Sequence, residues 1–157
     1  MSIPIRPGST RRTFISGGAL GAAALLVTAS RSDARDRTAA EKANVKIVDD
    51  FCASWVSHDP EKIASFMADD CTTRLSETQP PAKGRAALIE QLKGLFQRLE
   101  KVEIEVVESF VIGPTVLNDR IDYITRGGMR TSVPVAGFFL VKNGKIAEWT
   151  DYVLRNA

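Results

Sequence analysis

The sequence predicts an α+β fold in which a strongly curved sheet, antiparallel or mixed, packs against three N-terminal helices. Apolar residues recur at helical spacing through residues 40–99, whereas residues 102–154 show strand-like alternation. Tight-turn signals such as Asn143-Gly144 separate the later strands, and short connections favour antiparallel neighbours. A sheet with one apolar face needs helices to cover it. We therefore expect a pocket between the concave face and the helices.

Residues 1–34 have the pattern of a twin-arginine export signal. Arg11 and Arg12 precede Phe14 and the apolar run 15–27, which glycines and alanines dilute. This run is shorter than the roughly 20 apolar residues needed to span a bilayer. Small residues near positions 29 and 34 offer two cleavage sites. We expect a periplasmic or secreted protein that keeps no stable membrane anchor after cleavage.

The charge balance depends on the signal. Of 21 basic and 19 acidic side chains, four arginines and one aspartate fall in residues 1–34, which leaves 17 and 18 in residues 35–157. The remaining segment is therefore close to neutral, and its charge does not favour nucleic acid as a partner. Its length suits a single domain with a modest core.

Cysteine and histidine usage gives little reason to expect a metal or a cofactor. Cys52 and Cys71 permit one disulfide in an oxidising compartment, but Cys52 lies within a helical apolar pattern that favours two small core residues. The chain has one histidine, His58, which lies in a predicted turn and is expected at the protein surface. There is no Cys-x-x-Cys pair.

The helices are predicted in the first half of this segment. Phe51 and Trp55 continue an every-fourth-residue apolar pattern that predicts a helix over 40–57. Asp59 before Pro60 is an N-cap signal, so a short helix follows to about residue 67. A short strand over 69–77 ends at a Pro-Pro pair. A third helix is expected over 84–99.

The strands are predicted in the second half. Alternation begins at Val102, and three further strand-like segments cover 115–127, 129–142 and 145–154. Gly-Pro, Gly-Gly and Asn-Gly pairs separate them. The Asn-Gly pair is the strongest hairpin signal of the three.

Two of these strands carry charged residues among apolar neighbours. Arg120 and Asp122 share one face of the strand 115–127, and Asp151 shares a face with Trp149 on the last strand. Burial of such charges is costly unless they pair. An arginine can hold two carboxyl groups close together, and the crowding of the two pushes their pKa values apart. One can then act as a general base and the other as a general acid. A cross-strand salt-bridge network on a solvated face is the alternative explanation.

Several segments resemble limonene-1,2-epoxide hydrolase and its relatives. In the C-terminal half these are VLNDRIDY (116–123), VPVAGFF (133–139) and NGKIAEWTDY (143–152), and in the N-terminal half FCASWVSHDPEKIASFMADD (51–70) and residues 80–96. The resemblance covers about residues 43–153. It implies the cone-shaped α+β fold of the nuclear transport factor 2-like superfamily, which includes ketosteroid isomerases and polyketide cyclases. It also implies a homodimer formed through the sheet.

The resemblance assigns roles to three residues. Asp151 matches the carboxylate that deprotonates the attacking water, Asp122 matches the acid that protonates the epoxide oxygen, and Arg120 matches the arginine between them. The implied reaction opens a small apolar epoxide to a vicinal diol in one step, with no metal and no cofactor. Trp149 and Phe138 or Phe139 are expected to line the substrate pocket.

The strand before the Pro-Pro pair departs from the family pattern. The family positions its water with a tyrosine and an asparagine, and here the tyrosine falls on Thr73 or Arg74 and the asparagine on Leu75 or Ser76. Arg74 and Ser76 share a face by alternation and are candidate substrate-binding residues. If the Arg74 side chain points inward, it could orient an anionic ligand or lower the basicity of Asp151. The alternative is that Arg74 lies on the surface.

Three functions remain open from the sequence. The Arg120, Asp122 and Asp151 set favours an exported epoxide hydrolase. The missing tyrosine and asparagine favour an isomerase or cyclase that moves a proton next to a carbonyl, or a periplasmic module that binds a small molecule without catalysis.

Overall fold

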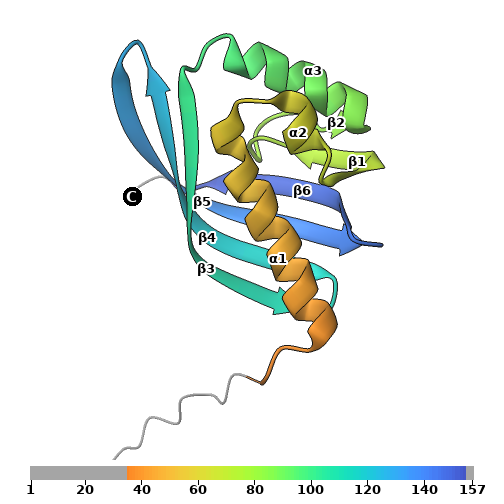
Figure 1. The fold of residues 1–157 in the computed structure, drawn as a ribbon. Coiled ribbons are helices and arrows are strands. Elements are labelled where there is room, and N and C mark those ends of the chain that lie inside the picture. The colour runs from red at the N-terminus through yellow and green to blue at the C-terminus, as the bar shows by residue number, and fades with distance from the viewer. Residues whose placement is uncertain (1–34, 155–157) are drawn as a thin grey trace, which may run out of the picture. The chain divides into compact units, whose positions relative to one another are not determined.

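The computed structural model describes residues 35–154 (Figure 1). The predicted export signal in residues 1–34 lies outside the described residues, as do residues 155–157. Within residues 35–154, no helix is long and apolar enough to cross a membrane.

The first helix, α1 (Ala39–Ser54), begins at a capping box. The Thr38 side chain accepts a hydrogen bond from the Glu41 backbone, and the Glu41 carboxylate accepts one from the Thr38 backbone. A 3-10 turn, η1 (Trp55–Ser57), continues it, and His58 then ends it in the left-handed conformation with φ 55°. The predicted helix over 40–57 is therefore present.

Two shorter helices follow. In α2 (Pro60–Ala64), Asp59 caps the N-terminus as the sequence predicts, accepting from the backbone of Glu61 and Lys62. This helix ends before residue 67, since the next strand begins there. Helix α3 spans Arg85–Phe96, within the predicted range.

The sheet is mixed and has six strands in the order β2-β1-β6-β5-β4-β3. They are β1 (Met67–Arg74), β2 (Ala82–Lys83), β3 (Lys101–Ile112), β4 (Thr115–Arg126), β5 (Met129–Lys142) and β6 (Lys145–Val153). Strand β1 pairs with β6 in parallel, and every other pair is antiparallel. The first predicted strand, 69–77, therefore begins two residues late and ends three residues late, and β2 was not predicted.

The helices lie on the inner side of the bent sheet. Figure 1 shows α1 crossing β3 to β6, while α2 and α3 lie toward the end of the sheet that carries β1 and β2. Phe51 of α1 has edge-to-face ring contacts with Phe139 of β5 and Trp149 of β6, and all three are buried. The predicted α+β fold, with helices against a curved sheet, is confirmed.

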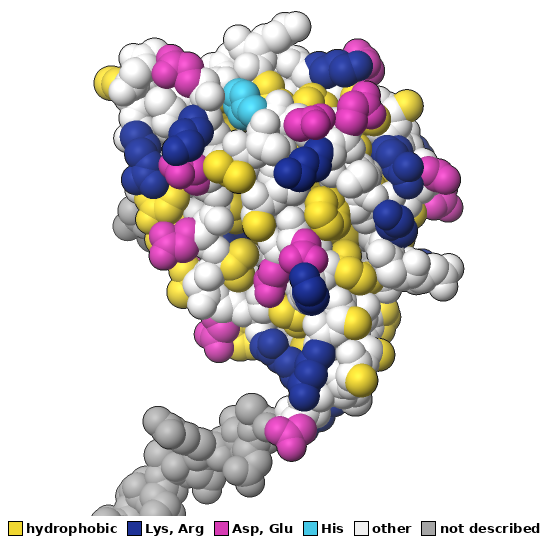
Figure 2. Space-filling model, in the orientation of Figure 1, with side chains coloured by type: hydrophobic (Ala, Val, Ile, Leu, Met, Phe, Trp, Pro, Cys, Tyr) yellow, Lys and Arg dark blue, Asp and Glu magenta, His cyan; other side chains and the backbone are white. Residues whose placement is uncertain are grey.

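The two cysteines and the histidine all pack against other residues of the domain. Cys52 and Cys71 are both buried and free, which matches their interpretation as small core residues. His58 lies at the surface, as expected (Figure 2), but it is only partly exposed because it stacks on Phe96 with the ring centroids 4.1 Å apart.

The two faces of the domain differ. On the face that carries α1, basic and acidic side chains are interspersed (Figure 2). On the outer face of the sheet, exposed apolar residues lie beside charged ones such as Glu105 and Asp119. Phe110 and Leu117 are cross-strand partners there with 53% and 44% of their surface exposed, and Phe138 lies beside Leu117.

Candidate functional site

Strands β4 and β6 bring the predicted acid–base residues together. Arg120 and Asp122 are two residues apart on β4, so both side chains point to the inner face. Asp151 points to the same face from β6. Because β5 lies between these strands, Arg120 must reach across β5 to contact Asp151.

Gly137 of β5 leaves the room for this contact. It pairs in register with Asn118 on one side and with Asp151 on the other. A Cβ atom at position 137 would lie 2.4 Å from both the Nη1 atom of Arg120 and the Oδ1 atom of Asn118. The absence of a side chain at position 137 therefore leaves the space through which Arg120 reaches Asp151.

Arg120 holds both carboxylates. Its Nε atom donates to Asp122 Oδ1 at 2.8 Å and its Nη2 atom lies 3.3 Å from Asp122 Oδ2. The same Nη2 atom donates to Asp151 Oδ2 at 2.5 Å. The Arg120 side chain is 1% exposed, against 15% for Asp122 and 7% for Asp151. This is a buried, charge-assisted network rather than a solvated surface pair.

Trp149 and Asn118 also form hydrogen bonds with this network. Trp149 Nε1 donates to Asp151 Oδ1 at 2.6 Å, so each Asp151 oxygen accepts one hydrogen bond. Asn118 Oδ1 lies 3.4 Å from Arg120 Nη1, and its amide nitrogen lies 3.5 Å from Cys52 Sγ. Burial raises the pKa of the Cys52 thiol to about 12, so the thiol stays neutral.

The burial of Asp151 determines its acidity. Removal from water raises the pKa of Asp151 to about 6, although the Arg120 charge and the hydrogen bonds from Arg120 and Trp149 act in the opposite direction. Burial also disfavours the Arg120 cation, but Asp151 and Asp122 outweigh it and raise the arginine pKa. Arg120 is thus a permanent positive charge, while Asp151 can change its protonation state near neutral pH.

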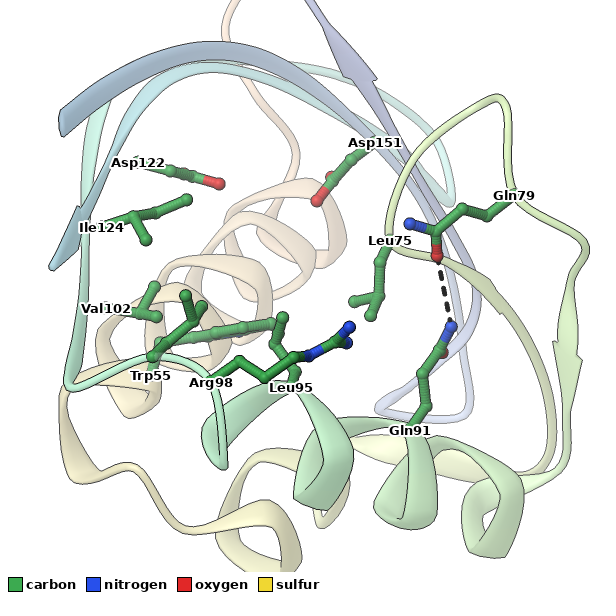
Figure 3. Close-up of a pocket in the computed structure, with 11 residues that line it drawn as sticks. Trp55, Leu75, Gln79, Gln91, Leu95, Arg98, Val102, Asp122, Ile124 and Asp151 are labelled. Atoms are coloured by element: carbon green, nitrogen blue, oxygen red, sulfur yellow. Dashed lines mark hydrogen bonds between the residues drawn. The ribbon is translucent and has the colours of Figure 1, made fainter. Parts of the chain in front are cut away.

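Asp122 and Asp151 open into a cavity of about 240 Å³ between the sheet and helix α3 (Figure 3). Both carboxylates point into it in Figure 3. The apolar part of its wall is formed by Trp55, Leu75, Leu95, Leu99, Val102 and Ile124. The remaining lining residues are Gln79, Gln91 and Arg98. The site thus combines two carboxyl groups with a cavity that suits a small molecule.

Five residues predicted to bind substrate do not line this cavity. Arg74 pairs in register with Thr150, whereas Thr73 pairs with Trp149 on the inner face. Side chains at paired positions share a face, so Arg74 lies on the outer side of the sheet. Ser76 lies in the following loop, where its hydroxyl contacts Thr78.

The three predicted aromatic residues also lie outside the lining of this cavity. Phe138 is on the outer face, opposite Leu117. Phe139 and Trp149 face inward but are buried in the core beneath the cavity. Of these two, Trp149 reaches the site indirectly, through its hydrogen bond to Asp151.

The inward positions on β1 and the loop after it are Thr73 and Leu75. Leu75 lines the cavity with Asp151 and brings no hydrogen-bonding group to it. Thr73 is buried, and its hydroxyl has no hydrogen-bond partner among the described residues. At this wall of the cavity, Leu75 therefore presents an apolar side chain to the space beside Asp151.

The sequence analysis missed Gln79, Gln91 and Arg98. One signal was available for Gln91, which lies three residues after Leu88 and four before Leu95 and so falls on the apolar face of α3. Gln79 and Arg98 lie outside regular elements, and no periodicity indicates their direction. Among the described residues, no group of three or more histidine, cysteine, aspartate or glutamate side chains is placed to hold a metal ion.

Residues 48–149 match the model of the SnoaL-like domain, and the chain belongs to this family. Its fold is similar to that of an LEH-like epoxide hydrolase from M. tuberculosis, with a TM-score of 0.65 and 22% identity over 73% of this chain and 84% of the other.

Two further solved structures are similar. The putative SnoaL-like polyketide cyclase from Jannaschia sp. CCS1 has a TM-score of 0.67 and 17% identity, over 76% of this chain and 90% of the other. The epoxide hydrolase/cyclase-like enzyme SalBIII, with a role in pyran ring formation in the polyether salinomycin, has a TM-score of 0.66 and 18% identity, over 73% and 92%. At these identities the likeness establishes the fold, and the reaction must be argued from the site.

Proposed function

We propose that the protein hydrolyses a small epoxide to a vicinal diol by direct attack of water. The observation that carries this proposal is the Asp122–Arg120–Asp151 network, in which both carboxylates border one cavity while a single guanidinium holds them. Opening an epoxide without a covalent intermediate needs simultaneous proton removal from water and proton donation to the leaving oxygen. The site offers two carboxylates for these two roles.

In this mechanism, Asp151 is the base. Ionised Asp151 accepts a proton from a water molecule as the water oxygen forms a bond to one epoxide carbon. The carbon–oxygen bond breaks, and Asp122, the proposed general acid, gives a proton to the departing oxygen. One proton then returns from Asp151 to Asp122 through solvent, which restores the starting state.

The charges of the site support a single shared proton. Arg120 contributes one positive charge and two ionised carboxylates contribute two negative charges, so one added proton makes the buried group neutral. A pKa of about 6 suits Asp151 for the base role, because a general base works best when its pKa lies near the working pH. Asp122 is the more exposed of the two carboxyl groups. Its Oδ2 atom lies 3.3 Å from Arg120 Nη2, so Arg120 holds it less strongly than Asp151 Oδ2, which lies 2.5 Å from the same nitrogen.

The test is diol formation by the purified protein on a panel of small cyclic and aryl epoxides, run beside Asp151→Asn. Single-turnover reactions in H₂¹⁸O add a second criterion. Direct attack places the label in the diol of the first turnover, whereas attack by an enzyme carboxylate leaves that diol unlabelled. Wild-type turnover that is lost in Asp151→Asn supports the proposal, and an unlabelled first-turnover diol contradicts its mechanism.

A second candidate is proton transfer next to a carbonyl, as in an isomerase or cyclase. Leu75 favours it, because this apolar residue stands beside Asp151 where a hydrolase would be expected to hold its water. Deuterium exchange at the α-carbon of small cyclic ketones in D₂O measures this activity. Exchange without diol formation would select the second candidate, and folded protein with neither activity would favour a binding module.

Export and self-association are separate proposals. We propose that Arg11 and Arg12 direct twin-arginine export, which a double Arg→Lys variant should block in a cell-fractionation experiment. We also propose that two copies associate through the outer face of the sheet, where Phe110 and Leu117 are exposed.

A further inference from the structure

The cavity wall opposite the two carboxylates is unexpectedly polar. Gln91 of α3 and Gln79 of the loop between β1 and β2 approach one another, with Gln91 Nε2 3.5 Å from Gln79 Oε1 (Figure 3). Arg98 lies in the same wall, just beyond the C-terminal end of α3. A purely hydrocarbon substrate would leave these groups without a partner.

Two buried atoms of this wall have unused hydrogen-bonding capacity. Gln91 Oε1 and Trp55 Nε1 are both buried, and neither has a partner among residues 35–154. A buried polar group without a partner destabilises the free protein. A ligand hydroxyl can donate to Gln91 Oε1, and a ligand oxygen can accept from Trp55 Nε1. The Gln79–Gln91 contact joins two amides, and rotation of both amides exchanges donor and acceptor. Gln91 can therefore offer either kind of partner.

Arg98 adds donors at the open side of the cavity. Its Nε atom donates to the carbonyl of Gly94 at 3.2 Å, which fixes the side chain against its own helix. In Figure 3 the guanidinium extends past Leu95 toward Gln91. Its outer nitrogens have no protein partner within the described part of the chain.

We infer that the substrate is oxygenated at both ends: the epoxide lies at Asp122 and Asp151, and a second oxygen function, a hydroxyl, carbonyl or carboxylate, lies at Gln91 and its neighbours. The position of the reactive end rests on the proposed function. Such a substrate differs from the small apolar epoxide expected from the sequence, which would leave Gln91 Oε1 and Trp55 Nε1 without a partner. A site built to hydrogen-bond a substrate oxygen discriminates strongly against the analogue that lacks it.

The test uses two unreactive probes of equal size, so that binding is measured without turnover. 4-Vinylbenzyl alcohol and 4-ethylstyrene have the same skeleton and differ only in a terminal hydroxyl or methyl group. Dissociation constants are measured by calorimetry for the wild type, for Gln91→Leu, and for the matched control Gln97→Leu. Gln97 is an exposed glutamine just after α3 that does not line the cavity.

The expected result is a change in preference. The ratio of the two dissociation constants should move about tenfold toward the hydrocarbon in Gln91→Leu, which corresponds to about 1.4 kcal/mol. It should remain within about twofold of wild type in Gln97→Leu. An unchanged ratio in Gln91→Leu, or an equal shift in both variants, would overturn the inference.

Different outcomes would contradict the oxygen site and the proposed hydrolysis. If the wild type shows the preference for the alcohol but forms no diol from the corresponding epoxides, the hydrolase is wrong and the oxygen site stands. If diol forms at equal rates from the hydroxymethyl and ethyl epoxides, and the probes bind equally, the hydrolase stands and the oxygen site is wrong.

Discussion

The indole Nε1 of Trp149 donates a 2.6 Å hydrogen bond to Asp151 Oδ1, from two residues earlier on the same strand. Side chains two apart on a strand share a face, so the strand itself holds the donor and the acceptor in one geometry. Trp149 is 1% exposed and is fixed by its contact with Phe51. The carboxylate that we assign as the base is therefore oriented by the aromatic core.

Asp151→Asn should lower kcat/KM by on the order of 10² to 10⁴, because an amide cannot accept the proton from water. Asp122→Asn should have an effect of similar size, because an amide cannot donate the required proton. Asp119→Asn is the matched control, since Asp119 is an exposed aspartate on the opposite face of β4. Steady-state kinetics and circular dichroism of all three variants test the assignment. Full activity in either active-site variant would remove that residue from the mechanism.

Trp149→Phe should shift the pH dependence of kcat/KM. The indole N–H lowers the pKa of Asp151, so its loss should move that pKa above about 6. Activity should therefore fall more at pH 6 than at pH 8. Phe139→Leu is the control, because it disturbs the same aromatic cluster without removing a donor to Asp151. A shift of the profile that is the same in both variants would indicate a packing effect only.

The wild-type enzyme should lose activity on the acidic side of pH 6. Burial raises the pKa of Asp151 to about 6, and protonated Asp151 cannot act as a base. The value of kcat/KM should fall about tenfold per pH unit below that point. A profile that stays flat down to pH 4.5 would exclude Asp151 as the titrating base.

The same pKa predicts how stability changes with pH. Between about pH 4 and pH 6 the folded chain keeps a proton on Asp151 that the unfolded chain has released, so this residue's contribution to stability falls as pH rises through that window. The change is on the order of 3 kcal/mol for a shift of about two units. Urea unfolding of the wild type and of Asp151→Asn at pH 4 and pH 7 measures it. A difference between the two proteins that does not vary with pH would contradict the raised pKa.

Gly137→Ala should weaken both the fold and the activity. The added Cβ atom meets Arg120 Nη1 and Asn118 Oδ1 at 2.4 Å, so the guanidinium must move away from Asp151. Overpacking of this kind costs about 1–3 kcal/mol. Gly94→Ala in α3 is the control, because nothing lies within 4 Å of its Cβ position and alanine favours a helix by about 0.5–1 kcal/mol. Chemical denaturation measures the loss of stability, and kcat/KM measures the loss of activity. Unimpaired activity in Gly137→Ala would contradict the requirement for free space at position 137 between Arg120 and Asp151.

Leu117→Lys should reduce self-association without changing the site. Leu117 lies on the outer face between Phe110 and Phe138, and a charge there would be costly to bury against a second copy. Light scattering after size-exclusion chromatography measures the mass of both proteins. A wild type that is monomeric at micromolar concentration would refute the proposed dimer.

The local elements could be predicted because their signals are local. Asp59-Pro60 does start a helix, and Asn143-Gly144 does form a hairpin turn with φ values of 51° and 73°. Alternation placed Arg120 and Asp122 on one face of their strand, and the structure shows that face to be the inner one. Their contact with Asp151 was only a conditional expectation, because it depends on β5 lying between β4 and β6.

The errors concentrate where the direction of a side chain depends on distant pairing. Strand β1 pairs in parallel with β6, and its register shifts between Met67 and Thr72. Because a shift by one residue reverses every side chain, the sequence could not decide between Thr73 and Arg74 as the inward residue. The aromatic predictions failed for another reason: Phe139 and Trp149 do face inward, but the core below the cavity buries them before they reach it.

Strand β6 carries Asp151 in the interior of the sheet, paired on both sides by β1 and β5, whereas Gln79 lies in a loop and Gln91 and Arg98 lie on or next to α3. The residues that we propose for proton chemistry and those that we propose for ligand selection thus belong to separate parts of the architecture. A library that varies only positions 79, 91 and 98 would leave the acid–base framework untouched while changing what enters the cavity. Such a division makes the domain a favourable starting point for directed evolution toward new substrates.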